Sequence, residues 1–146
     1  MIRAILCGAL LASTSGSAVA AQPTYYPSQF PYPFSDAVQA GDMLILSGQI
    51  GAKPGGGAVV PGGIEPETRQ ALDNVAASLK RRGLGMDSVV KCTAMLADMK
   101  EWPAFNAIYA TYFKKGHYPA RSAFGVGGLA LGARVELECW AYSPGK

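Results

Sequence analysis

The sequence predicts one α+β domain, in which a mixed β-sheet carries its helices on a single face. The first reason is size and composition, because 146 residues that are 49% apolar can form one compact core and hardly a second. The second is the order of the patterns, which runs strand, helix, strand, helix and then two strands. The third is chirality, because right-handed crossovers place consecutive helices on the same side of a sheet.

Residues 1–20 are typical of a secretory signal peptide. Arg3 precedes an apolar run that stops at Ser13, and small residues follow up to the end of the segment. A membrane anchor is the alternative, but a spanning helix needs roughly 20 continuous apolar residues. We therefore expect cleavage near Ala20 or Ala21, a periplasmic or secreted protein, and no membrane contact after cleavage.

Residues 21–33 are predicted to form an extended arm. The stretch AQPTYYPSQFPYPF holds four prolines and five aromatic residues, and proline removes amide donors and excludes a helix. So many aromatic side chains are poorly suited to water, so we expect the arm to lie along the body or along a partner subunit. The folded domain is expected to extend from residue 34 to residue 143.

The elements of that domain follow from the periodicity of the apolar residues. Met43 to Ile50 is β-rich and predicts a strand, and a glycine-rich connector follows it. From Glu65 the apolar positions recur every three or four residues, which predicts a helix. Acidic residues stand at its beginning and the segment Lys80 to Gly83 at its end, as is typical of helix termini. A strand over 89–97, a second helix that Gly116 ends, and strands over 121–126 and 133–142 complete the domain.

The last strand is predicted to have two unlike faces. Its apolar face suits the helices and consists of Val135, Leu137, Cys139 and Ala141. Its other face consists of Arg134, Glu136, Glu138, Trp140 and Tyr142. A solvated open face is the alternative for the two acids, but the two aromatic residues beside them favour a partner. Three sheets closing around an axis would cover the aromatics and enclose the acids with Arg121, in a site shared by two subunits.

Two cysteines, Cys92 and Cys139, remain once Cys7 has left with the signal peptide. Each falls in a strand pattern, where a small buried thiol is the favoured interpretation. A disulfide between them is the alternative, and the sequence leaves it open.

The net charge of the mature chain is small. It is 12 minus 10, or +2, and the sequence shows no basic stripe. We therefore expect no nucleic-acid partner.

From about Pro33 to Tyr142 the chain resembles the RidA/YjgF family of reactive-intermediate deaminases, once labelled endoribonucleases. The resemblance is carried by the stretches SGQIG (47–51), TRQALDNVAASL (68–79), VVKCTAMLADM (89–99), FNAIYATYF (105–113), PARSAFGV (119–126) and ARVELECWAY (133–142). It implies a chorismate-mutase-like fold with a six-stranded mixed sheet and a homotrimer. It also implies clefts between subunits that bind small carboxylates, with no metal and no organic cofactor.

The resemblance further implies an activity and its residues. The activity is hydrolytic deamination of 2-imino acids, such as 2-iminopropanoate and 2-iminobutanoate, to 2-oxo acids and ammonia. Arg121 takes the position that grips the substrate carboxylate, and Glu136 the position linked to the attacking water. Ser47 and Asn106 take two substrate-binding positions.

Two further substrate-binding positions depart from the family pattern. Phe34 stands where a tyrosine is frequent, and Ala123 stands where some members have cysteine. A hydroxyl and a thiol are therefore missing, so the family pattern does not settle the substrate preference of the chain.

The chemistry of these residues agrees with the expected reaction. A guanidinium meets a carboxylate through two hydrogen bonds, so Arg121 is the expected clamp. Glu136 is the expected general base for the water that attacks the C=N carbon. Alternatives are a non-catalytic periplasmic module that binds small carboxylates and a holdase-like module that uses the arm. RNA cleavage is the weakest alternative because the mature charge is near neutral.

Overall fold

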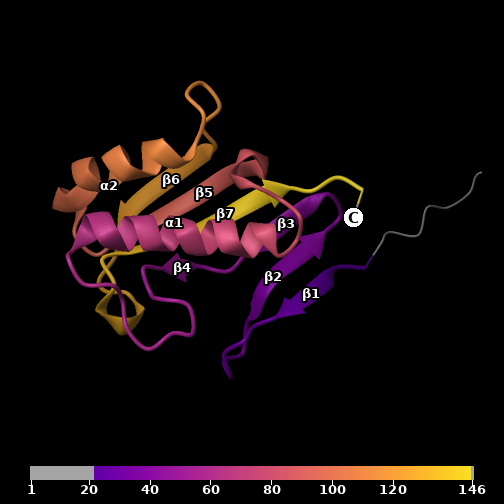
Figure 1. Ribbon diagram of the computed structural model, residues 1–146, viewed down its shortest axis with the longest axis horizontal. Coiled ribbons are helices and arrows are strands. Elements are labelled where there is room, and N and C mark those ends of the chain that lie inside the picture. Colours follow the sequence, from indigo (N-terminus) through magenta and orange to yellow (C-terminus); the bar gives the residue numbers. More distant parts are fainter. Residues whose placement is uncertain (1–21, 146) are drawn as a thin grey trace, which may run out of the picture.

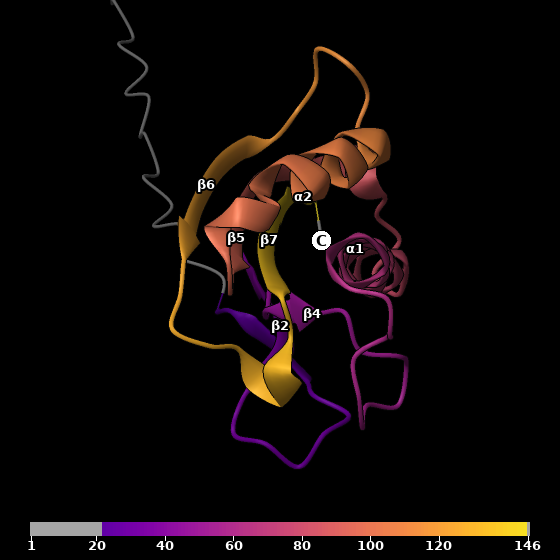
Figure 2. The same ribbon diagram turned by 90° about the vertical axis from the view of Figure 1, so that its left-hand side faces the viewer.

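The computed structural model of the chain describes residues 22–145, so the expected signal peptide and Cys7 lie outside the described residues. Within that range the chain forms a mixed β-sheet with two α-helices (Figure 1). Seen from the end, both helices lie on the same side of the curved sheet (Figure 2). The predicted α+β class and the placement of both helices on one face are confirmed.

The elements are as follows. The helices are α1 (Ile64–Lys80) and α2 (Trp102–Tyr109), and short 3₁₀ turns occur at Met86–Ser88, Met99–Glu101, Ala110–Tyr112 and Ala130–Gly132. The strands are β1 (Thr24–Pro27), β2 (Ser35–Ala40), β3 (Met43–Leu46), β4 (Gln49–Ile50), β5 (Val89–Leu96), β6 (Ala120–Gly125) and β7 (Val135–Tyr142).

The sheet has the strand order β1-β2-β3-β7-β5-β6, and the short β4 also pairs with β7. The continuous path thus holds the six strands expected, and β4 is a seventh. β5 and β6 run parallel and are joined through α2, whereas the other pairs are antiparallel. β6 is therefore an edge strand, and it carries Arg121.

The core lies between the helices and the sheet. Leu72, Val75 and Leu79 of α1 are fully buried there, which confirms the predicted apolar stripe. Glu65 and Glu67 lie in the first turn of α1, where the helix dipole favours negative charge. Among residues 22–145, no helix is long and apolar enough to cross a membrane.

The second helix ends earlier than predicted. α2 stops at Tyr109, a 3₁₀ turn follows, and Phe113 is extended rather than helical. Contacts with the body accompany this ending. The Tyr112 hydroxyl donates to the Asp73 carboxylate of α1 at 2.8 Å, and the Phe113 ring lies 4.8 Å from the Tyr109 ring. Packing of these aromatic side chains thus replaces the last helical turns before Gly116.

The strand predicted from Met43 to Ile50 is broken in the structure into β3 and β4. The break falls at Ser47 and Gly48, between the two segments that pair with β7. A Cβ atom at Gly48 would overlap the Glu136 carboxylate. A side chain at this position would therefore have to displace the Glu136 carboxylate.

The described part of the arm lies along the body. β1 pairs with β2 at the edge of the sheet, opposite to β6. The Tyr26 ring of β1 lies 4.5 Å from the Arg82 guanidinium at the end of α1. β1 thus tethers the described arm to both layers of the domain.

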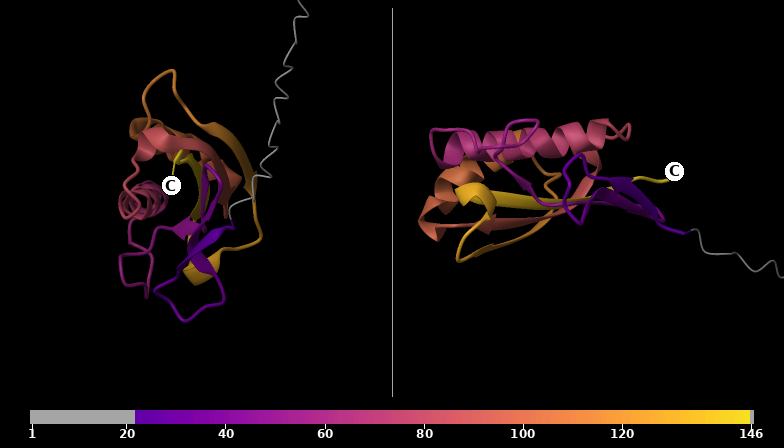
Figure 3. Two further views of the ribbon diagram at one scale, coloured as in Figure 1. Left: turned by 90° about the vertical axis from the view of Figure 1, so that its right-hand side faces the viewer. Right: turned by 90° about the horizontal axis from the view of Figure 1, so that it is seen from below.

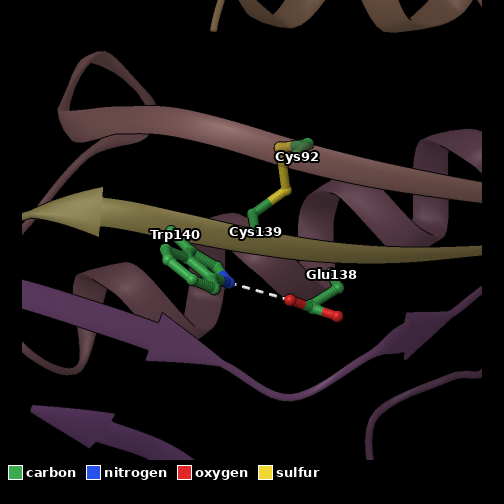
Figure 4. The surroundings of a disulfide bond; sticks show 4 residues. All are labelled: Cys92, Glu138, Cys139 and Trp140. Carbon is green, nitrogen blue, oxygen red and sulfur yellow. Dashed lines mark hydrogen bonds between the residues drawn. A yellow bond between two sulfur atoms is a disulfide. The ribbon is translucent and has the colours of Figure 1, made fainter. Parts of the chain in front are cut away.

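Cys92 and Cys139 form a disulfide, which corrects the expectation of two separate buried thiols. They are direct partners in the β5–β7 pair, with Cα atoms 4.2 Å apart. Both are fully buried, and Figure 4 shows the bridge between the two strands. The expectation was wrong because the pairing of residues 47 positions apart is set by the folded sheet.

The predicted alternation of β7 is confirmed. The apolar positions are buried under the helices, whereas Glu136 and Glu138 are half-buried on the other face. Trp140 and Tyr142 are 39% and 49% exposed. The Trp140 indole N–H donates to the Glu138 carboxylate at 2.8 Å (Figure 4). Figure 3 shows α1 on one side of the sheet, so this other face is open in a single copy.

Candidate functional site

Arg121 lies on the helix-facing side of the edge strand β6. It is the parallel partner of Cys92, which is fully buried under the helices, and paired residues share a face of a sheet. Its guanidinium carbon lies 4.8 Å from the Trp102 ring, 5.4 Å from the Phe105 ring and 4.5 Å from the Tyr109 ring. The charge therefore lies against aromatic rings of α2.

No carboxylate lies within ion-pair distance of Arg121 among residues 22–145. Its neighbours on β6 are small, and Ala123 two residues later is half-buried on the same face. Asn106 follows Phe105 on α2 and is half-buried as well. We call Arg121, Ala123 and Asn106 the arginine half of the site.

Glu136 lies on the open face of β7, opposite Ile50 of β4. Burial raises the pKa of the Glu136 carboxyl above its ordinary value, and the like charge of Glu138 raises it further. The carboxylate lies over the bare backbone of Gly48. A base with a raised pKa is better matched to a proton transfer near neutral pH than an ordinary glutamate is.

Ser47 and Phe34 lie on the segments beside this acid. The Ser47 hydroxyl donates to the Ser35 carbonyl at 2.5 Å, and the Ser47 amide donates to the Asp36 carbonyl at 3.1 Å. Phe34 directly precedes β2, is 48% exposed and lies 6.1 Å from the Tyr32 ring. We call Glu136, Ser47 and Phe34 the glutamate half of the site.

The two halves lie on opposite faces of the sheet. Arg121 shares its face with Cys92 and Cys139, whereas Glu136 points the other way from Cys139 along β7. Two hollows of the chain, of about 430 and 250 Å³, are lined by none of the six candidate residues. A single copy therefore does not bring its arginine to its own glutamate.

The donor set suits acid–base and carboxylate chemistry. Within residues 22–145, no three or more His, Cys, Asp or Glu side chains are grouped so that they could hold a metal ion. The arginine half offers a cation, and the glutamate half offers a proton acceptor. Together these groups can bind an anion and activate water.

The sequence did not reveal that Gly48 contacts Glu136 or that aromatic residues of α2 lie against Arg121. Gly48 was visible inside SGQIG, but its close contact with Glu136 depends on the β4–β7 pairing. Phe105 and Tyr109 lie three and four residues apart from other apolar positions of the predicted second helix, and both are buried as one stripe. Their spacing could not show that the stripe covers Arg121.

Comparison with known proteins identifies the family of the chain. A protein-family model described as endoribonuclease L-PSP matches residues 28–143. The chain is 46% identical over 109 residues to the mouse (Mus musculus) 2-iminobutanoate/2-iminopropanoate deaminase, covering 75% of this chain and 80% of the mouse protein. The human (Homo sapiens) protein of the same name is 42% identical over 109 residues, covering 75% of this chain and 79% of the human one.

Solved structures give the same result for the fold. A Rid-family protein of unknown function from Yersinia pestis superposes with a TM-score of 0.76 at 36% identity, covering 83% of this chain and 99% of that one. RidA from an Antarctic Psychrobacter superposes with a TM-score of 0.72 at 28% identity, covering 81% of this chain and 94% of that one. The chain therefore belongs to the RidA/YjgF family, whose domain is also described as endoribonuclease L-PSP.

Proposed function

We propose that this protein hydrolyses 2-imino acids of the 2-iminopropanoate and 2-iminobutanoate type to 2-oxo acids and ammonia. The observation that carries the proposal is the Arg121 guanidinium, which lies against aromatic rings with no carboxylate beside it in the described chain. Such a cation is available to an anionic ligand. Relatives at 42–46% identity bear the name of this activity, which supports the same assignment.

Arg121 binds the carboxylate of the substrate. The planar guanidinium donates two parallel hydrogen bonds to a carboxylate, and this fixes the plane of the adjacent C=N group. The small residues around Arg121 on β6 leave space for the ligand. Fixing both reactants in one orientation lowers the barrier without a covalent nucleophile.

Glu136 activates the water. Its carboxylate accepts a proton as the water oxygen bonds to the imine carbon, and the C=N bond becomes a C–N single bond. The proton then passes to nitrogen, which gives a tetrahedral intermediate with one hydroxyl and one amino group. Glu136 then carries the hydroxyl proton to that amino group, the C–O bond becomes C=O as the C–N bond breaks, and ammonia leaves with the 2-oxo acid. The raised pKa of Glu136 suits it to both transfers, because the group must first accept and then release the same proton.

A complete site requires two copies of the chain. The arginine half lies at the sheet edge on the helix side, and the glutamate half lies on the open face. We place the arginine half of one copy against the open face of the next, in a closed homotrimer. This arrangement also covers the exposed Trp140 and Tyr142 side chains.

Phe34 and Ala123 set the preference for the substrate side chain. Neither provides a polar side-chain group, so this part of the cleft is apolar. The small side chain of Ala123 also leaves space where some family members have cysteine. We therefore expect small apolar substrate side chains to be accepted, with few polar contacts to discriminate among them.

We also propose that the protein acts outside the cytoplasm, since its first twenty residues have the pattern of a signal peptide. Intact-mass measurement of periplasmic material is expected to give a chain that begins near Ala21 or Gln22. Detection of the uncleaved chain in the cytosol alone would contradict export.

The decisive experiment compares the parent with Arg121→Lys. Steady-state hydrolysis of 2-iminopropanoate generated in situ is measured, together with calorimetric binding of 2-oxobutanoate. We expect Arg121→Lys to keep the fold but to lose about tenfold to a hundredfold in kcat/KM, or about 1.4–3 kcal/mol. Unchanged turnover in this variant would refute the clamp. A parent that binds 2-oxobutanoate but hydrolyses nothing would instead identify a carboxylate-binding module.

A further inference from the structure

Three aromatic residues of α2 surround the Arg121 guanidinium. The ring centres of Trp102, Phe105 and Tyr109 lie 4.8, 5.4 and 4.5 Å from its central carbon. They occur at spacings of three and four residues, so they form one stripe of the helix. We call these three residues the aromatic cage.

The rings of the aromatic cage pack against one another. The Trp102 and Phe105 rings lie 6.0 Å apart, and the Phe105 and Tyr109 rings lie 5.5 Å apart. Phe105 is fully buried and Tyr109 is 4% exposed, whereas Trp102 is partly exposed at the beginning of the helix. The cage is therefore anchored in the core and reaches the surface through Trp102.

The cage attracts the cation without cancelling its charge. A guanidinium over an aromatic face is stabilised by the ring quadrupole, whereas an ion pair would neutralise it. Burial raises the pKa of Tyr109 to about 12, with the Arg121 charge opposing this shift, so the phenol stays neutral at physiological pH. The Tyr109 hydroxyl is buried and lacks a hydrogen-bond partner within the described range, so a donor is also left free near Arg121.

We propose that Trp102, Phe105 and Tyr109 are positioning residues that hold Arg121 as an unneutralised cation for a substrate carboxylate. The inference rests on the proposed function, because it assumes that Arg121 is the clamp. It adds a reason why a residue with many rotatable bonds holds one orientation. The rings restrict the guanidinium, so less freedom is lost when the carboxylate binds.

The test uses Trp102, the member of the cage that lies nearest the surface. Calorimetric binding of 2-oxobutanoate is compared among the parent, Trp102→Leu and Trp102→Phe. We expect the leucine variant, which removes the ring, to raise Kd by about tenfold, and the phenylalanine variant to stay within about threefold of the parent. Tyr25→Leu, on the exposed edge strand β1, is the matched control and should bind as the parent does.

A spectroscopic measurement decides the matter if Trp102→Leu does not fold. The chain has two tryptophans, so Trp140→Phe leaves Trp102 as the single emitter. Binding of 2-oxobutanoate neutralises the neighbouring cation, so we expect the emission of Trp102 to change with the calorimetric Kd. Adding Arg121→Met should abolish that change.

The outcomes separate the cage from the proposed reaction. Equal affinity of the parent and Trp102→Leu, or an unchanged Trp102 emission during proven binding, overturns the cage even if the parent turns over imines. If the parent binds 2-oxobutanoate without turning over imines, and if Trp102→Leu weakens that binding or the Trp102 emission changes with it, the cage is supported and the proposed reaction is overturned. A parent that neither binds nor hydrolyses overturns both.

Discussion

Reduction of the Cys92–Cys139 disulfide is expected to lower the free energy of unfolding by about 2–4 kcal/mol. The bridge joins residues separated by 47 positions, and the chain-entropy relation for such a loop gives about 4 kcal/mol at 25 °C. Measured effects commonly fall below this limit because the reduced chain keeps some structure. For a domain of this size the loss corresponds to about 8–16 °C in Tm.

The assay is urea denaturation of the chain from Gln22 onwards, oxidised and reduced, at one fixed protein concentration. A fixed concentration is needed because the proposed homotrimer would make the apparent stability depend on protein concentration. Reduction keeps both sulfur atoms in the core, so the comparison isolates the cross-link from packing. The double variant Cys92→Ala/Cys139→Ala adds the cost of two small cavities and should be less stable than the reduced parent.

Two results would refute this reasoning. The first is a denatured, unreduced chain in which both cysteines react as free thiols, because the bridge would then be absent. The second is an identical urea midpoint for the oxidised and reduced chains, because the loop would then contribute no stability.

Three further predictions follow from the site and its supports. Glu138→Gln removes the like charge that raises the pKa of Glu136, so the acidic limb of the kcat/KM profile should move to lower pH; an unmoved limb would argue against Glu136 as the base. Gly48→Ala places a methyl group where the Glu136 carboxylate lies and should cost at least about tenfold in kcat/KM, whereas Gly127→Ala, which meets no atom within 4 Å, should be neutral. Asp36→Asn should cost about 1–3 kcal/mol at pH 7 in urea denaturation. Burial raises the pKa of Asp36, but hydrogen bonds from two arginines outweigh it and leave the pKa below 3.8, so the difference from the parent should shrink as the pH falls below that value.

Local periodicity predicted both helices and the strands from Met43 onwards, but it did not predict β1 or β2. The apolar stripe of α1 and the alternation of β7 each depend on neighbours within one element, and both were predicted from sequence. The Gly48 break and the disulfide were not, because each depends on which strand lies beside β7. The end of α2 was also misplaced, because side-chain contacts with α1 and Tyr109 replace its last turns.

The candidate site was predictable as a set of residues but not as an arrangement. Alternation shows which residues of one strand share a face, but it does not relate Arg121 on β6 to Glu136 on β7. That relation needs the register of both strands with β5, and this register places the two side chains on opposite faces. The aromatic rings beside Arg121 could not be predicted either, because their contact depends on how α2 packs against β6.

Because Arg121 and Glu136 lie on opposite faces, a chain altered at one residue and a chain altered at the other should be able to complement each other. If clefts form between copies, a chain with Arg121→Lys still supplies a normal glutamate, and a chain with Glu136→Gln still supplies a normal arginine. In trimers assembled at random from equal amounts of both chains, each cleft has one half times one half, or about a quarter, probability of uniting the two intact groups. Co-refolding of the two impaired variants should therefore restore about a quarter of the parental turnover, whereas mixing their separately folded trimers without exchange should give only their own residual turnover.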